Sequence, residues 1–203
     1  MRHIFIINPA AGKKDGRQRV YTMAEALKKN HDLDIECMLT KSRGHAMMLT
    51  RAIAETGVRS IQLHTGGMCH LDAAMTREGL QQLGTQGLDL VILENVGNLV
   101  CPAEFDTGAH LNLMILSVPE GHDKPLKYPL IFQTCGAMIV NKIDVLPYFD
   151  FDLDKVTEFA RRRNPDLEIF PISAKTGEGV EALADWLCSR IRTHKEKKKE
   201  TNA

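Results

Sequence analysis

The residues with the clearest chemistry follow a short apolar stretch in the second half of the chain. Residues 137–140 are typical of a buried parallel strand, which brings Asn141, Lys142 and Asp144 to its carboxyl end. Ligands of open α/β sheets bind at that end. With the spacing Asn-Lys-x-Asp, the carboxylate of Asp144 can accept both the ring N–H and the exocyclic amine of guanine, a paired contact that adenine does not offer. The pattern therefore favours a guanine base.

A second motif, Ser173-Ala174-Lys175, follows the next predicted strand, residues 169–172. Guanine-nucleotide proteins pair N-K-x-D with a later S-A-K, whose backbone N–H faces the base oxygen. Asn141 can tie the two loops together, and the stem of Lys142 can lie over the base plane. A strand end that happens to be polar is the alternative for either motif alone, and their order in this chain favours the base site.

Three residues suit a soft or borderline metal ion. Cys69 and His70 are adjacent at the end of one predicted strand, and Cys101 follows the next. Parallel neighbours bring these loops to one sheet edge, and two thiolates with an imidazole suit zinc or nickel. Adjacent Cys and His are awkward for a closed four-ligand site within one chain, so a second subunit or water would complete it. The alternative is two buried cysteines that act as small hydrophobes.

Two further residues end the predicted strand 88–93. The carboxylate of Glu94 can face a magnesium-bound water, and Gly97 lets the backbone approach a terminal phosphate. A simple strand-terminating turn is the alternative.

The front of the chain offers a second phosphate candidate, a strand, a loop with Gly12 and Lys13, and then a helix. Backbone N–H groups and a helix N-terminus in this arrangement can face phosphate. The loop departs from G-x-x-x-x-G-K-[ST], because Ile7 stands in place of the first glycine and Lys14 in place of the magnesium-binding hydroxyl. The alternative is a βα unit that only completes the sheet.

Apolar strands alternate with amphipathic helices, which predicts a single α/β domain, a mostly parallel sheet with helices on both faces, over residues 1–193. The strands are expected at 4–8, 34–39, 59–64, 88–93, 111–118, 137–141 and 169–172. The helices are expected at 17–30, 44–55, 70–83, 126–134, 153–163 and 179–192. Trp186 is expected to anchor the last helix in the core, and the lysine-rich residues 194–203 are expected to form a flexible tail.

Composition limits the classes of partner. The 203 residues suit one sizeable domain, and 26 basic residues balance 26 acidic ones, so neither nucleic acid nor an anionic membrane is the expected partner. No membrane span or signal peptide is apparent, so a cytoplasmic protein with five reduced cysteines is expected. Cys37, Cys135 and Cys188 are expected in the core.

Residues 61–187 resemble HypB, the family of nickel-incorporation GTPases in hydrogenase maturation. The likeness lies in ordered blocks: Q-L-H-T-G-G-M-C-H-L-D-A at 62–73, L-E-N-V-G-N-L-V-C-P-A at 93–103, K-P-L-K-Y-P at 124–129, N-K-I-D at 141–144 and S-A-K-T-G-E-G at 173–179. The resemblance implies a P-loop NTPase-like fold of the SIMIBI type and a GTP-binding nickel metallochaperone. It also implies GTP or GDP, Mg²⁺ and Ni²⁺ or Zn²⁺ as ligands, a homodimer with the metal at its interface, and hydrogenase maturation proteins as partners.

Residues 1–57 instead resemble the start of the diacylglycerol/lipid kinase catalytic domain. The likeness lies in N-P-A-A-G-K-K-D-G at 8–16 and T-K-S-R-G-H-A at 40–46. The next strand of that family should end in G-G-D-G-T, and this chain has T-G-G-M-C at 65–69. Two alternatives to a HypB-like protein thus stay open, a lipid kinase and a metal-binding scaffold that hydrolyses nothing. Whether the chain is a GTP-hydrolysing enzyme stays open with them.

Overall fold

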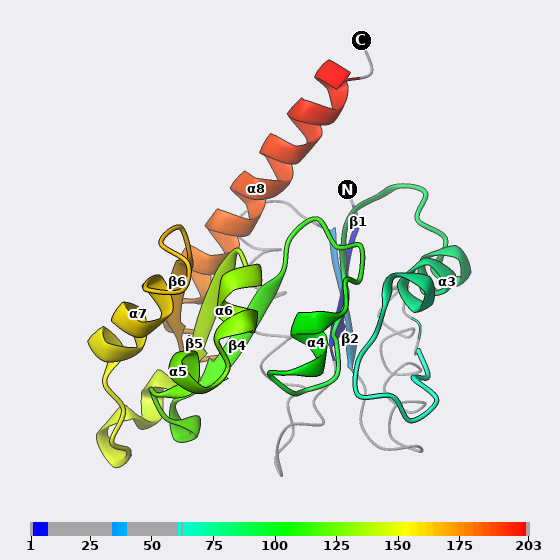
Figure 1. The fold of residues 1–203 in the computed structure, drawn as a ribbon. Coiled ribbons are helices and arrows are strands. Elements are labelled where there is room, and N and C mark those ends of the chain that lie inside the picture. The colour runs from blue at the N-terminus through cyan, green and yellow to red at the C-terminus, as the bar shows by residue number, and fades with distance from the viewer. Residues whose placement is uncertain (1, 8–33, 40–60, 62, 202–203) are drawn as a thin grey trace.

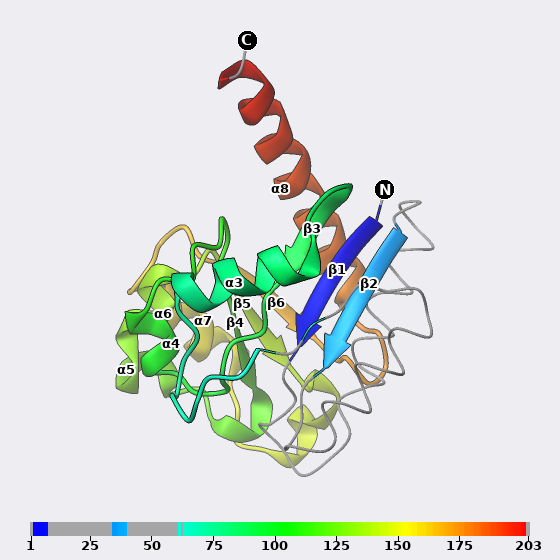
Figure 2. The same ribbon diagram turned by 90° about the vertical axis from the view of Figure 1, so that its right-hand side faces the viewer.

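The computed structural model describes residues 2–7, 34–39, 61 and 63–201. The strands of this part of the chain are β1 (Arg2–Ile7), β2 (Asp34–Leu39), β3 (Leu88–Ile92), β4 (Leu113–Ser117), β5 (Ala137–Asn141) and β6 (Glu168–Ile172). They pair in parallel as two three-stranded sheets, in the orders β2-β1-β3 and β4-β5-β6 (Figures 1 and 2). The predicted parallel α/β fold is confirmed. Its described strands form two hydrogen-bonded sets in place of one continuous ladder.

Helices connect the strands and cover them. They are α3 (Ala73–Leu83), α4 (Cys101–Glu104), α5 (Lys124–Lys127), α6 (Pro129–Thr134), α7 (Leu153–Arg161) and α8 (Val180–Thr201), with 3₁₀ helices η1 (Val118–Glu120) and η2 (Ile143–Tyr148). The helices expected at 17–30 and 44–55 lie outside the described residues. Residues 61, 63 and 64, the described part of the strand expected at 59–64, are not in a strand.

Strand β5 is buried along its whole length and has a hydrophobic cluster on each face. Met138 and Val140 pack into one cluster with Phe132 of α6, and α7 contributes to the same cluster. Ile139 points to the opposite face and packs with Leu183 of α8. Because successive side chains of a strand face opposite sides, an uninterrupted apolar run fits a strand covered on both faces. Each large side chain buried this way contributes roughly 1.5–3 kcal/mol.

Local chemistry sets the helix ends more sharply than the apolar periodicity does. The helix expected at 126–134 is divided into α5 and α6, because Pro129 begins α6 and Tyr128 before it leaves the helical region with φ −130 and ψ 61. Proline disfavours helical backbone in the residue that precedes it. Helix α3 begins at Ala73, three residues later than expected, because the Asp72 side chain accepts from the N–H of Met75 and caps it.

Helix α8 is longer than expected. It continues to Thr201, over most of the segment predicted to be a flexible tail, and its last turns extend past the sheets (Figures 1 and 2). Lysine and glutamate, which fill this segment, are good helix formers. Trp186 is half-buried, with its ring 5.3 Å from that of Phe170, so it packs at the edge of the core. Among the described residues, no helix is both long and apolar enough to cross a membrane.

The register of β5 and β6 fixes which loops share the sheet edge. Asn141 pairs with Ile172, and Ser117 of β4 pairs with Asn141 from the other side. The segments that begin at Lys142 and Ser173 therefore leave the sheet side by side, at its carboxyl edge.

The loop after β6 depends on one glycine. An added Cβ at Gly179 would lie 2.2 Å from the carbonyl oxygen of Pro171, and the φ of +73 is in the left-handed region. Gly179→Ala should lower the free energy of unfolding by roughly 3 kcal/mol or more, from backbone strain plus the clash. Gly87→Ala is the control, because its φ is +77 but an added Cβ meets nothing within 4 Å; it should cost about 1–2 kcal/mol. Equal losses in urea unfolding would contradict the clash.

Candidate nucleotide and metal site

Asn141 connects the two predicted base-binding loops. Its side chain is 8% exposed, and Oδ1 accepts from the backbone N–H of Lys142 at 2.7 Å and from that of Ala174 at 3.2 Å. The second bond joins the end of β5 to the loop after β6. Lys142 has a φ of 69, and it is the one non-glycine residue with positive φ in the described part of the chain. The backbone thus turns sharply where the two motifs meet.

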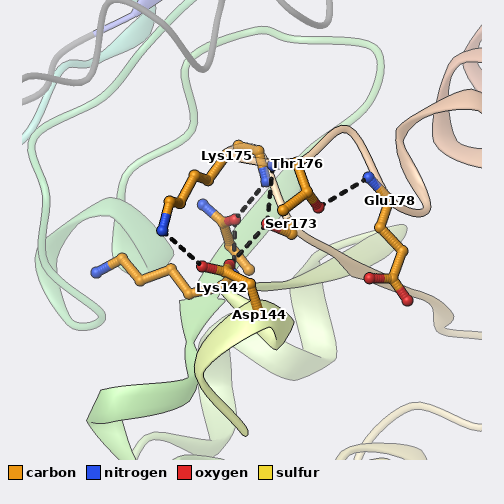
Figure 3. A network of polar contacts seen from close by, with 8 residues as sticks. Lys142, Asp144, Ser173, Lys175, Thr176 and Glu178 are labelled. Carbon is orange, nitrogen blue, oxygen red and sulfur yellow. Dashed lines mark hydrogen bonds and ion pairs between the residues drawn. The ribbon is translucent and has the colours of Figure 1, made fainter.

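The carboxylate of Asp144 is positioned by the second loop (Figure 3). The hydroxyl of Ser173 donates to Oδ1 at 2.6 Å, and Nζ of Lys175 lies 4.0 Å from Oδ2. The Lys175 side chain is 81% exposed and that of Asp144 15% exposed, so solvent screens this ion pair and it adds little stability. Ser173 is fully buried and fixes one carboxylate oxygen, while the other faces the exposed Lys175 in a long ion pair. That second oxygen can accept from a ligand.

The rest of the Ser173 loop is braced by its own backbone. The N–H of Gly177 donates to the carbonyl of Ser173 at 2.8 Å, and the N–H of Ser173 donates to the carbonyl of Glu178 at 2.9 Å. The hydroxyl of Ser173 accepts from the N–H of Thr176, and the hydroxyl of Thr176 accepts from the N–H of Glu178 (Figure 3). The predicted contacts omitted Thr176 and Glu178, although T-G-E-G follows S-A-K directly in the sequence.

The structure brings two of the three predicted metal ligands together. The sulfurs of Cys69 and Cys101 lie 2.6 Å apart, and both cysteines are free thiols. Cys69 is exposed and Cys101 half-buried. The hydrogen bond from Cys69 raises the pKa of Cys101 above its ordinary value. This pair is therefore not part of a hydrophobic core, whereas Cys135 and Cys188 are buried as predicted. The side chain of Cys37 lies outside the described residues.

His70, the third predicted metal ligand, lies beside the sulfur pair and is held by an aromatic contact. Its ring is 8% exposed and stacks on Phe105 with 3.6 Å between ring centroids and 8° between planes. Its Nδ1 lies 3.9 Å from the sulfur of Cys69. No group of three or more side chains suited to a metal occurs in the part of the chain that the structure describes. Stacking on Phe105 stabilises the imidazole beside the sulfur pair, and the complete three-residue ligand set is not assembled.

Two asparagines hold the cysteine-bearing loops together. Asn98 donates from Nδ2 to the carbonyl of Cys69 at 2.8 Å, and its Oδ1 accepts from the N–H groups of Val100 and Cys101. Asn95 accepts at Oδ1 from the N–H of Leu71 at 2.8 Å. Both asparagines stand in the E-N-V-G-N block, and neither is assigned a role from the sequence. The sequence feature that could have indicated their role is a pair of amide side chains in the short loop between a strand and a cysteine.

Glu94 is a half-buried acid of the site whose Oε2 is fully enclosed. Its Oε2 has no hydrogen-bond partner among the described residues, and burial raises the pKa of this carboxyl to about 10. A buried oxygen without a partner is costly, and it suits a site that a cation or a water completes. Gly97 in the same loop is exposed. Gly12 and Lys13 lie outside the described residues.

A family model described as "CobW/HypB/UreG, nucleotide-binding domain" matches residues 23–171. Among individual proteins, the hydrogenase maturation factor HypB of Escherichia coli K12 is 39% identical over 186 residues, which are 92% of this chain and 63% of that protein. The hydrogenase/urease maturation factor HypB of Helicobacter hepaticus is 35% identical over 188 residues, 91% of this chain and 76% of that protein. The chain thus spans less than two thirds of the Escherichia coli relative.

Two solved structures are similar in fold. HypB from Helicobacter pylori, in complex with nickel, superposes with a TM-score of 0.73 at 33% identity, over 94% of this chain and 88% of that one. HypB from Archaeoglobus fulgidus gives a TM-score of 0.72 at 29% identity, over 94% and 90%. The lipid-kinase interpretation of residues 1–57 receives no support, because the family match begins inside that segment and the Escherichia coli match covers 92% of the chain.

The half-buried acid Glu94 generates a prediction on stability. The folded protein keeps the proton of Glu94 up to a pKa of about 10, whereas the unfolded chain releases it near the ordinary value of 4.5. Because the folded state binds the extra proton, the free energy of unfolding falls as pH rises between these values, by up to ~1.4 kcal/mol per pH unit. Glu94→Gln should remove this slope. In urea unfolding, the free energy of unfolding of the variant minus that of the unmodified protein should therefore increase from about pH 5.5 to about pH 8.5.

The control for that experiment is Glu168→Gln, since the side chain of Glu168 is exposed. This variant should follow the unmodified protein at every pH. Parallel stability curves for Glu94→Gln and the unmodified protein would show that the carboxyl of Glu94 is not protonated by burial.

Proposed function

Since this chain belongs to the CobW/HypB/UreG family of nucleotide-binding domains, we propose that it is a HypB-like guanine-nucleotide-binding protein that carries nickel for hydrogenase maturation. The names of the relatives and the nickel in the Helicobacter pylori structure support the cargo and the process. The observation that carries the nucleotide is the linkage of the two base motifs through Asn141 and Ala174, beside a carboxylate fixed by Ser173.

Base recognition in this proposal uses the free acceptor capacity of Asp144. Ser173 orients the carboxylate, and Oδ2 faces the exposed Lys175. A guanine ring N–H and amine can replace that weak ion pair with two hydrogen bonds to a charged acceptor, which are stronger than neutral ones. Adenine presents no such pair of donors, so the same carboxylate would be left partly unpaired and the site rejects it.

The phosphate side is assigned to Gly12, Lys13, Glu94 and Gly97. Glu94 suits the neighbourhood of Mg²⁺, because its Oε2 is buried without a partner among the described residues and a nearby cation would favour the ionised form. Gly12 and Lys13 would hold the phosphates from the front loop. Bound Mg²⁺ would supply electrostatic stabilisation of the charge that develops when GTP is hydrolysed.

The cargo side is assigned to Cys69, His70 and Cys101. Two thiolates suit nickel or zinc, and they already lie together at an accessible position. His70 stands next to them with its ring held by Phe105. Because the described chain supplies fewer than three assembled donors, the proposal includes a homodimer in which a second copy or water completes the metal's coordination.

One loop connects the two sides. Glu94 begins it, Asn95 and Asn98 bind the neighbouring loop within it, and Cys101 ends it. Any movement of Glu94 with nucleotide state would therefore be transmitted to the cysteines through the seven-residue step from Glu94 to Cys101 and through the hydrogen bonds of Asn95 and Asn98. This loop is the element through which GTP and GDP would give the metal site two different geometries.

Asp144→Asn tests the base assignment. The variant turns one acceptor oxygen into a donor that faces the amine of guanine, which should weaken GDP binding by about 1–3 kcal/mol and improve binding of xanthosine diphosphate. Titration calorimetry measures both. Asp154→Asn on the exposed face of α7 is the control and should change neither affinity. If ATP displaces bound GTP at the same concentration as unlabelled GTP does, the base assignment is wrong.

Cys101→Ala tests the cargo assignment. The purified protein should bind about one nickel or zinc ion per chain, and this variant should lose affinity by roughly tenfold or more because one of two thiolates is removed. Cys188→Ala, in the core, keeps both thiolates and should bind the metal as the unmodified protein does. Equal losses in both variants, or none in either, would count against the site.

A further inference from the structure

The sulfur pair permits a reaction that metal binding does not use. Cys69 and Cys101 are 32 positions apart in sequence, yet their sulfurs lie 2.6 Å apart as free thiols. Thiols in such proximity can exchange with an external disulfide and then with each other, provided that one of them is accessible. Cys69 meets that condition, since it is exposed.

Hydrogen bonds between the Asn98 side chain and the backbone of both cysteines hold the two sulfurs near each other. Asn98 binds the carbonyl of Cys69 through Nδ2 and the N–H of Cys101 through Oδ1, at 2.8 and 2.9 Å. These bonds hold the two loops together without using either sulfur. They therefore keep the thiols adjacent when no metal is bound, which is the state in which the thiols are open to oxidation.

We propose that Cys69 and Cys101 form a reversible intramolecular disulfide, with a small-molecule disulfide of the glutathione class as oxidant. The other described cysteines offer no second pair of this kind. Cys135 and Cys188 are 6% and 7% exposed, and both pack in hydrophobic surroundings. The reaction thus selects one pair, the pair to which the cargo metal is assigned.

The chemistry takes two exchanges. The thiolate of Cys69 attacks one sulfur of the oxidant, the oxidant's S–S bond breaks, and one small thiolate leaves and takes up a proton. The thiolate of Cys101 then attacks the Cys69 sulfur of the mixed disulfide and expels the second small thiolate, which is also protonated. Overall the two protein thiols lose two electrons and two protons, and the oxidant is reduced to two thiols.

The disulfide would close the cargo site, because neither sulfur could then act as a thiolate ligand. Metal bound first should in turn protect the pair from oxidation. This consequence rests on the proposed function, whereas formation of the disulfide does not depend on it. The oxidation state of the pair would then decide whether the site can bind the metal.

The test uses metal-free protein of the full chain incubated with glutathione disulfide. Intact mass should show a loss of two hydrogens with no added glutathione, non-reducing gels should show monomers, and peptide mapping should join Cys69 to Cys101. Dithiothreitol should restore both thiols. Cys101→Ser should stop at a Cys69–glutathione adduct, and Cys188→Ala should react as the unmodified protein does.

Asn98→Ala tests the positioning. With the Asn98 bonds lost and the Asn95–Leu71 bond alone joining the loops through these two asparagines, the sulfurs are held less closely. The mixed disulfide should then accumulate roughly tenfold or more over the unmodified protein, because closure depends on orientation. Asn112→Ala, at an exposed side chain, is the control. Stable adducts in the unmodified protein, disulfides between chains, or no reaction would each overturn the inference. Disulfide formation without any effect on nickel binding would leave the pair oxidisable and refute only the assigned cargo site.

Discussion

The parallel pairing of β5 with β6 is the constraint on which the proposed base site depends. Register places Asn141 opposite Ile172, so the two polar motifs begin at the same edge although some thirty residues separate them. Burial of β5 on both faces holds that register, because a slip of one residue would exchange the side chains that face α7 and α8. The hydrogen bond from Ala174 to Asn141 then joins loops that the sheet has already brought together.

Cysteine and base sites are built by the same means, a carboxamide that binds backbone across two loops. Asn141 does so after β5, and Asn98 does so after β3. An amide side chain is suited to this because it offers donors and an acceptor at once. In both places the amide fixes the loops and leaves the chemically active groups, the Asp144 carboxylate and the two thiols, available to a ligand.

Glu94 differs from the two asparagines, because its surroundings do not satisfy it. Without a ligand, its desolvated carboxyl destabilises the folded state. Its Oε2 is buried without a partner among the described residues, and desolvation raises the pKa of the carboxyl to about 10. A ligand that pairs with this carboxyl would remove the cost of its desolvation and so bind more favourably. Glu94 lies in the loop that leads to Cys101. The same residue thus lowers stability and, in the proposed function, couples nucleotide to metal.

The sequence by itself determined the parallel α/β class and most strand positions, and it located the two motifs of the proposed base site, because buried strands and the motifs N-K-x-D and S-A-K are local patterns. It located the cysteines but not their contacts. Only the tertiary structure decided that the two sulfurs meet, that His70 stacks on Phe105 apart from a finished ligand set, and that Asn95 and Asn98 hold the loops. Such contacts form between segments about thirty residues apart. Residue type and spacing do not determine the side-chain orientation that results when the two loops pack together. The break before Pro129 follows from local proline chemistry, although one unbroken helix was expected over 126–134. The enclosure that raises the pKa of Glu94 depends on packing and could not be predicted from local sequence.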